Sequence, residues 1–124
     1  MTNRVVFPWP SKGLWPNDRP HWAERARAVK DYRRDATILA QAAGWHRQGV
    51  PSLIRMTFCP KPLGKRPDRD NCIGAAKALQ DALAAVWGVD DATLTVRHDM
   101  GERCKGGGVI VEIFHSVELR GVVS

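Results

Sequence analysis

The chain has 124 residues, of which 44% are hydrophobic and 26% charged, and its formal net charge is +6 with a pI near 9.7. This length and composition predict one folded domain over residues 1–124 and exclude an intrinsically disordered chain. The excess of Lys and Arg over Asp and Glu favours an anionic partner such as nucleic acid.

Targeting and redox features favour the cytoplasm. No apolar run reaches the roughly 18 residues of a membrane-spanning helix, so we expect no membrane span. Pro8, Pro10 and Lys12 interrupt the apolar residues near the N-terminus, so these residues do not form the apolar core of a secretory signal peptide. Cys59, Cys72 and Cys104 are odd in number and unrelated in spacing, which argues for reduced thiols in a reducing compartment.

The hydrophobic pattern predicts strands and helices in the order β-α-β-α-β-β. In chain order these are a strand from Arg4 to Trp9, a helix from Trp22 to Ala43, a strand from Ser52 to Cys59, a helix from Asp70 to Trp87, and strands from Thr93 to His98 and from Val109 to Phe114. The last two strands are expected to pair antiparallel through the glycine-rich loop between them. The order predicts an α/β or α+β fold, in which two main helices cover a small mixed sheet.

The second predicted helix has two chemically different faces. Asp70, Lys77 and Asp81 fall on one face. The opposite face is apolar and holds Cys72, Ala76, Leu79, Leu83, Val86 and Trp87. Gly88 is expected to end this helix, with Asp90 and Asp91 just beyond it.

Acidic residues gather around the ends of this helix. Asp68, expected in a loop, and Asp70, expected at or near the N-cap, can direct both carboxylates to one side, and Asp91 is the candidate for a third ligand. Convergent carboxylates suit a hard cation such as Mg²⁺, which can activate water and neutralise charge on a phosphate. Lys77 lies on the same helix face as Asp70 and could stabilise the same charge.

A purely structural explanation of these residues stays open. Asp68 and Asp70 would be ordinary loop and N-cap residues, and Asp91 would belong to a polar turn. Lys77 and Asp81 would form an exposed i, i+4 ion pair.

The length of the helix raises a geometric question. A straight helix from Asp70 to Trp87 is roughly 25 Å long, so Asp91 should not reach Asp68 and Asp70 around it. Either the chain doubles back after Gly88 and the helix is shorter, or two subunits share the site. In a two-fold dimer with antiparallel helices, the Asp91 end of one subunit would meet the Asp70 end of the other.

The five tryptophans could pack in the core or stack on bases. Trp9, Trp22 and Trp87 are predicted to lie in the core. Trp15 and Trp45 occur in loop-like segments, and their role stays open.

Several short motifs occur together in a specific order. They are F-P-W-P from Phe7, Y-R-R-D from Tyr32, P-D-R-D-N from Pro67, K-A-L-Q-D-A-L from Lys77, G-V-D-D-A from Gly88 and K-G-G from Lys105. Over nearly the whole chain this pattern resembles the RusA-type Holliday junction resolvases, which are common in phages and prophages.

The resemblance implies a homodimeric, Mg²⁺-dependent endonuclease with a mixed α/β fold, for which Mn²⁺ could substitute as the metal. It would resolve four-way DNA junctions by paired nicks in DNA recombination and repair. By position, Asp68, Asp70 and Asp91 would hold the metal, and Lys77 would be the catalytic lysine. The residues expected to meet branched DNA are Lys12, Lys65, Arg66, Arg69 and Lys105.

The position of the lysine departs from the family's best-known pattern. There the lysine follows the D-N pair by three residues, whereas Lys77 follows Asn71 by six. The three extra residues make nearly one helical turn, so Lys77 lies on the same face of the helix as the family's lysine, one turn further along. Two other functions remain open, a basic DNA- or junction-binding protein without catalysis and a less selective nuclease of branched DNA.

Overall fold

The computed structural model describes residues 2–116. Its helices and strands are β1 (Arg4–Phe7), α1 (Trp22–Ala42), β2 (Leu53–Cys59), α2 (Arg69–Ala75), α3 (Lys77–Trp87), β3 (Val96–Met100) and β4 (Gly108–Phe114). Short 3-10 helices occur at Lys12–Leu14 (η1), Pro16–Asp18 (η2), Trp45–Arg47 (η3) and Asp91–Thr93 (η4). None of the helices in this part of the chain is long and apolar enough to cross a membrane.

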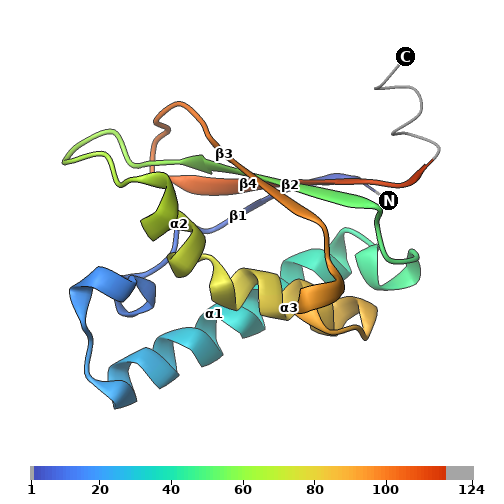
Figure 1. Cartoon of the computed structure of the whole chain (residues 1–124), viewed down its shortest axis with the longest axis horizontal. Coiled ribbons are helices and arrows are strands. Elements are labelled where there is room, and N and C mark those ends of the chain that lie inside the picture. Colours follow the sequence, from blue (N-terminus) through green and yellow to red (C-terminus); the bar gives the residue numbers. More distant parts are fainter. Residues whose placement is uncertain (1, 117–124) are drawn as a thin grey trace.

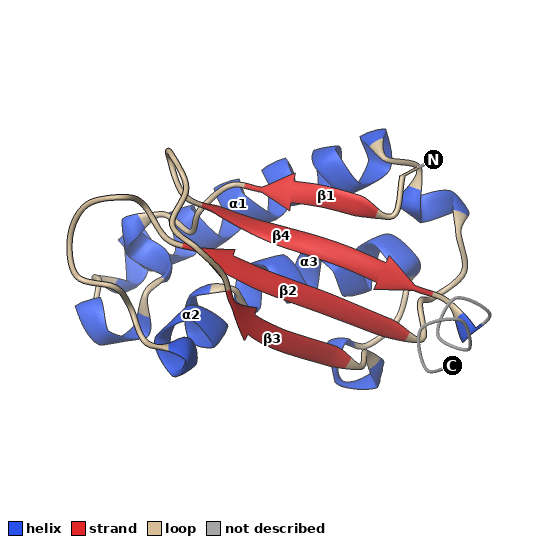
Figure 2. Cartoon of the chain, turned by 90° about the horizontal axis from the view of Figure 1, so that it is seen from above, coloured by secondary structure: helices blue, strands red, loops and turns tan. Residues whose placement is uncertain are grey.

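The strands form one mixed sheet in the order β1-β4-β2-β3 (Figure 2). β4 pairs antiparallel with both β1 and β2, so that Val111 lies opposite Val5 on one side and Met56 on the other. β2 and β3 run parallel, with Ile54 opposite Val96. The α2–α3 segment makes the crossover between these parallel strands, as a parallel pair requires.

The helices pack on one face of the sheet (Figure 1), and the core lies between the two layers. Alternate residues of β2 and β4 point inward and are fully buried, among them Met56, Phe58 and Val111. α1 contributes the buried Ala36, and α3 the buried Leu79. The predicted mixed α/β class, with two main helices on a small mixed sheet, is confirmed.

The predicted pairing of the last two strands is wrong. β3 does not form a hairpin with β4, but adds to the outer edge of β2 in parallel. β4 is an inner strand, paired with β1 on one side and β2 on the other, and its Val109, Val111 and Ile113 are buried. A glycine-rich loop is compatible with a hairpin but does not require one.

The second predicted helix is interrupted. α2 and α3 are separated at Ala76, whose backbone angles of φ −88° and ψ 5° leave the helical range. Two residues earlier, a Cβ on Gly74 would lie only 2.6 Å from Cγ of Pro16. The missing side chain therefore allows η2 to pack against α2 beside the break, at a helical glycine where kinks commonly form.

The tryptophans differ from their predicted positions. Trp45 is 0% exposed and Trp22 is 76% exposed, so the prediction that Trp22 lies in the core is wrong. Trp9 and Trp87 are partly buried against the core, as predicted, and Trp15 packs there too. The indole of Trp45 stacks on Trp87 with ring centroids 5.9 Å apart.

Candidate active site

The start of α2 holds two of the predicted site acids. Asp68 is the N-cap residue, and its carboxylate accepts a hydrogen bond from the backbone N–H of Asn71 at 2.8 Å. Asp70 lies in the first helical turn and is exposed. The helix thus begins earlier than predicted, and Asp68, expected in a loop, takes the cap position expected for Asp70. Local capping accounts for the conformation of Asp68, whereas Asp70 contributes only the small stabilisation that a carboxylate gives to the first turn of a helix.

Lys77, the first residue of α3, connects two acids. Its ammonium group donates a hydrogen bond to Asp81 at 3.2 Å and another to Asp91 at 2.5 Å. The contact with Asp91 forms because the chain reverses after Gly88, which adopts a left-handed conformation with φ 68°. Asp90 then caps η4 by accepting a hydrogen bond from the N–H of Ala92 at 3.0 Å. The chain doubles back after a short helix, as one of the two predicted arrangements requires, but the reversal brings Asp91 to Lys77 and completes no three-acid group with Asp68 and Asp70 within residues 2–116.

The charges in this cluster reinforce one another. The hydrogen bond from Lys77 is the largest cause that lowers the pKa of Asp91, so that its carboxylate stays ionised at neutral pH. The carboxylates of Asp91 and Asp81 raise the pKa of Lys77 and keep it charged. The side chain of Lys77 is nevertheless 59% exposed and so remains accessible to an anion from solution.

The predicted three-acid metal set does not form within one chain. Among residues 2–116, no three Asp, Glu, His or Cys side chains are grouped in a way that could hold a metal ion. Asp91 is paired with Lys77, and Asp68 is engaged in capping α2. The donor chemistry of these acids suits Mg²⁺, but their arrangement in a single chain does not complete a site for it.

Both predicted DNA-binding arginines also make hydrogen bonds within the fold. Arg66 donates to the backbone oxygen of Gly101 at 2.6 Å, and Arg69 donates to that of His98 at 2.9 Å. Both arginines are exposed despite these bonds. They therefore fix the start of α2 against the end of β3 and still present positive charge to solvent.

Arg103 is a residue whose role the sequence did not indicate. Its guanidinium group donates to the backbone oxygens of Lys61 at 2.9 Å, Pro62 at 3.2 Å and Gly64 at 3.0 Å. The basic loop of residues 60–67, which precedes α2, is thus held by the neighbouring loop of residues 101–107, where the exposed Lys105 lies. The two loops lie together at one end of the sheet (Figure 1).

Replacing Arg103 with lysine should loosen the 60–67 loop. Lysine cannot reproduce a planar fork that reaches three carbonyl oxygens, and each lost hydrogen bond is worth about 0.5–1.5 kcal/mol. We expect trypsin to cleave after Lys65 roughly tenfold faster, because cleavage requires local opening of the loop. Mass spectrometry of the fragment that ends at Lys65 would measure the rate.

The matched control is Arg97→Lys, since Arg97 is also exposed but its side chain, among the described residues, bonds to Asp99 alone. It should leave cleavage after Lys65 unchanged. Equal cleavage rates for the Arg103→Lys and wild-type proteins would show that the three hydrogen bonds do not restrain the loop.

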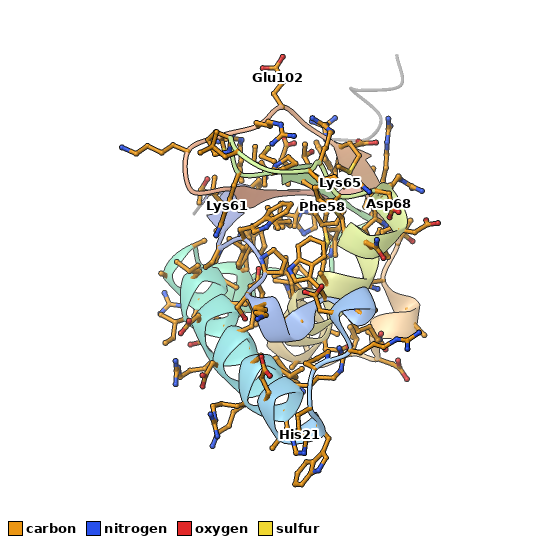
Figure 3. All side chains as sticks on the ribbon, turned by 90° about the vertical axis from the view of Figure 1, so that its left-hand side faces the viewer. His21, Phe58, Lys61, Lys65, Asp68 and Glu102 are labelled. Atoms are coloured by element: carbon orange, nitrogen blue, oxygen red, sulfur yellow. The ribbon has the colours of Figure 1, made fainter. Side chains whose placement is uncertain are left out.

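A groove lies beside these loops. Its larger part, with a volume of about 370 Å³, is lined by Trp9 and Trp15 and by Lys12, Lys61 and Lys65. A smaller hollow of about 280 Å³ shares Trp15, Lys65 and Pro67 with it and extends to Asp68 and Asn71. Figure 3 views this end of the molecule, where Lys61, Lys65 and Asp68 are labelled.

Of the predicted site residues, the structure joins Lys77 with Asp91 and places Asp68 and Asp70 together at the start of α2. It also places Lys12 and Lys65 on one groove, to which Arg66 contributes. Sequence reasoning left out of the site Trp9 and Arg103, because their contacts come from segments distant in the chain. The glycines and prolines around these residues indicated loops but not which loops meet.

Fold and site together define a small basic α/β protein with an acid–lysine cluster near basic loops. No protein-family model matches the chain. An uncharacterized protein of Xylella fastidiosa is 34% identical to it over 111 residues, which cover 86% of this chain and 72% of that protein. The chain belongs to the same family as this Xylella protein.

Proposed function

We propose that this protein is an endonuclease of the RusA-type Holliday junction resolvase family. It would cleave four-way DNA junctions by paired phosphodiester hydrolysis in DNA recombination and repair. The observation that carries the proposal is the contact between Lys77 and Asp91, which are 14 residues apart and are both site residues by the resemblance. A stability role alone does not account for this choice of partners, because the side chain of Lys77 is 59% exposed and ion pairs with an exposed partner contribute little.

The proposed metal ligands are Asp68, Asp70 and Asp91, with Mg²⁺ as the natural ion and Mn²⁺ as a substitute. When bound by carboxylates, Mg²⁺ supplies an activated water and neutralises charge on a phosphate. Since the three acids do not group within one chain, we propose that two subunits of a homodimer share the site. Asp68 and Asp70 would come from one subunit and Asp91 from the other.

Lys77 would act on the phosphate directly. In the free protein its ammonium group is held by two carboxylates while most of its side chain stays exposed. A phosphate oxygen at the same position would accept one of these hydrogen bonds, and the ammonium charge would stabilise the negative charge that grows during hydrolysis. Asp81 would keep the lysine oriented through the remaining bond.

The basic loops supply the proposed DNA surface. Lys12, Lys65, Arg66, Arg69 and Lys105 are all exposed and lie in or next to the loops around the start of α2. Contacts of this kind hold the phosphate backbone without reading sequence. Branched DNA in the cytoplasm is the proposed substrate, and the free thiols of the described cysteines fit that compartment.

A second candidate function is a basic junction-binding protein without catalysis. It is favoured by the absence of a three-acid group within residues 2–116 and by the capping role of Asp68. A less selective nuclease of branched DNA would use the same residues as a resolvase and differ only in how the dimer fits its substrate.

Cleavage of a labelled synthetic four-way junction, beside a linear duplex of the same sequence, tests these functions. The resolvase should cut the junction but not the duplex, with Mg²⁺ and not with EDTA. Cleavage of flaps and junctions alike would indicate the less selective nuclease. Tight junction binding with no cleavage in Mg²⁺ or Mn²⁺ would indicate the binding protein.

A further inference from the structure

The groove described above has an aromatic wall in a fixed orientation. The rings of Trp9 and Trp15 lie 5.4 Å apart between centroids at an angle of 42°. The indole N–H of Trp15 donates to the backbone oxygen of Pro10 at 3.1 Å, so its polar edge is already satisfied. Both tryptophans are half-buried and line the groove, which leaves ring surface for a ligand.

The wall is supported from behind by the loop of residues 101–107. A Cβ on Gly107 would lie 2.9 Å from Cγ of Trp9, and this glycine has a φ of +70°. Only a residue without a side chain allows the loop to approach the ring so closely. Trp9 is therefore packed between this loop, the ring of Trp15 and the core in the free protein.

The charge around the wall is mostly positive. Lys12, Lys61 and Lys65 line the groove, and Asp18 is the carboxylate among its lining residues. All three lysines are exposed, so they can reach an anion without losing a buried partner. Flat apolar rings beside several ammonium groups fit a ligand that joins a planar ring to phosphates, which is the chemistry of a nucleotide.

The groove also leads to the candidate active site. Its two parts share Trp15, Lys65 and Pro67, and the smaller part is lined by Asp68. The volume of about 370 Å³ for the larger part falls within the roughly 300–1,000 Å³ of typical ligand pockets. A strand with one base in the larger part would have its next phosphates near the acids.

We propose that this groove binds one unpaired nucleotide of a DNA strand, with its base on the Trp9–Trp15 wall and its phosphates at the three lysines. A base within a continuous duplex is covered by its neighbours on both faces, so the groove selects a base that has left the stack. At the branch point of an open junction each terminal base pair lacks a stacked neighbour on one face, so its bases leave the stack at the lowest cost, and in this respect the inference rests on the proposed function. It adds a means of recognising the branch point next to the site of cleavage.

Binding of short oligonucleotides in EDTA tests the groove without any cleavage. Fluorescence anisotropy would compare a labelled oligothymidylate with an abasic strand of the same length, which carries the same phosphates but no bases. We expect the wild-type protein to bind the oligothymidylate about tenfold more tightly, as stacking of one base predicts. Equal affinity for the two strands would overturn the proposal.

Three variants locate the effect, with circular dichroism as a check on folding. Trp15→Ala should lose most of the preference for the base-bearing strand, and the double variant Lys12→Ala with Lys61→Ala should weaken binding to both strands. Trp22→Ala is the matched control, because Trp22 is 76% exposed and does not line the groove, and it should keep the preference. A preference lost in Trp22→Ala and kept in Trp15→Ala would contradict the proposal. The wild-type comparison decides the case if Trp15→Ala does not fold.

The groove and the nuclease can fail separately. Junction cleavage combined with equal affinity for the two strands would contradict base binding in the groove and support the nuclease activity. A preference for the base-bearing strand combined with no cleavage of any junction would support base binding in the groove and contradict the nuclease activity.

Discussion

Asp70→Asn should reduce cleavage of a four-way junction by more than about a hundredfold, while junction binding stays equal or becomes tighter. Asp70 is exposed in the first turn of α2, beside the capping Asp68, and its side chain forms no ion pair with any residue in 2–116, so its substitution should leave folding intact. The substitution keeps the size of the side chain but removes a negative charge from the proposed metal site. Binding should not suffer, because one anion near the DNA phosphates is removed.

Cleavage rates and binding constants for the same labelled junction would measure both effects. Asp31→Asn is the matched control, since it makes the same charge change on α1, where Asp31 is 51% exposed and pairs with Arg34. It should cleave at the wild-type rate. Full cleavage by Asp70→Asn would exclude the acids at the start of α2 from the mechanism.

Trp45→Ala should lower the free energy of unfolding by about 3–5 kcal/mol, the usual cost of removing a buried tryptophan side chain. Trp45 is fully buried, contacts Phe7 and Trp87, and donates its indole N–H to the backbone oxygen of Thr2 at 2.6 Å. Its own backbone oxygen accepts the indole N–H of Trp87 at 2.9 Å. This loss is a large share of the roughly 5–15 kcal/mol that stabilises a typical domain.

Urea unfolding followed by circular dichroism would measure the loss. Trp22→Ala removes the same side chain from a site that is 76% exposed, and it should change the free energy of unfolding by no more than about 0.5 kcal/mol. Equal losses for the two variants would contradict the assignment of Trp45 to the core and of Trp22 to the surface.

The local parts of the fold could be predicted from the sequence. Alternating apolar residues identify β2 and β4, because one face of each strand is buried. The helical period identifies α1, and glycines at positions 44 and 88 with positive φ mark where α1 and α3 give way to turns. These features depend on neighbours within a few residues, which a sequence pattern records.

The features that could not be predicted depend on distant segments. The sequence pattern of β3 is compatible with pairing to either β4 or β2. The crossover through α2 and α3 places β3 beside β2. Trp45 follows a helix-ending glycine and looks like a loop residue, yet the turn that begins there directs it into the core. Trp22 fits the apolar stripe of α1 but lies on its first turn, beyond the packed layer.

In the candidate site, too, the local features could be predicted from the sequence and the contacts between distant segments could not. The acids at Asp68 and Asp70 follow from the motif around α2, and the sequence allowed for the chain reversal that brings Asp91 back. It could not show that Asp91 would meet Lys77 in place of Asp70, because that contact depends on where α3 ends and how η4 is capped. The hold of Arg103 on the 60–67 loop is equally non-local.

If two subunits together form the proposed metal-dependent nuclease site, a mixture of two inactive variants should regain activity. In a mixed dimer of Asp70→Asn and Asp91→Asn subunits, a shared site places both substitutions in one site and leaves the other intact. Co-expression of the two variants should therefore restore about a quarter of the wild-type nicking of a four-way junction in Mg²⁺, from the half of the dimers that are mixed. A mixture as inactive as each variant alone, beside an active wild-type protein, would contradict the shared site.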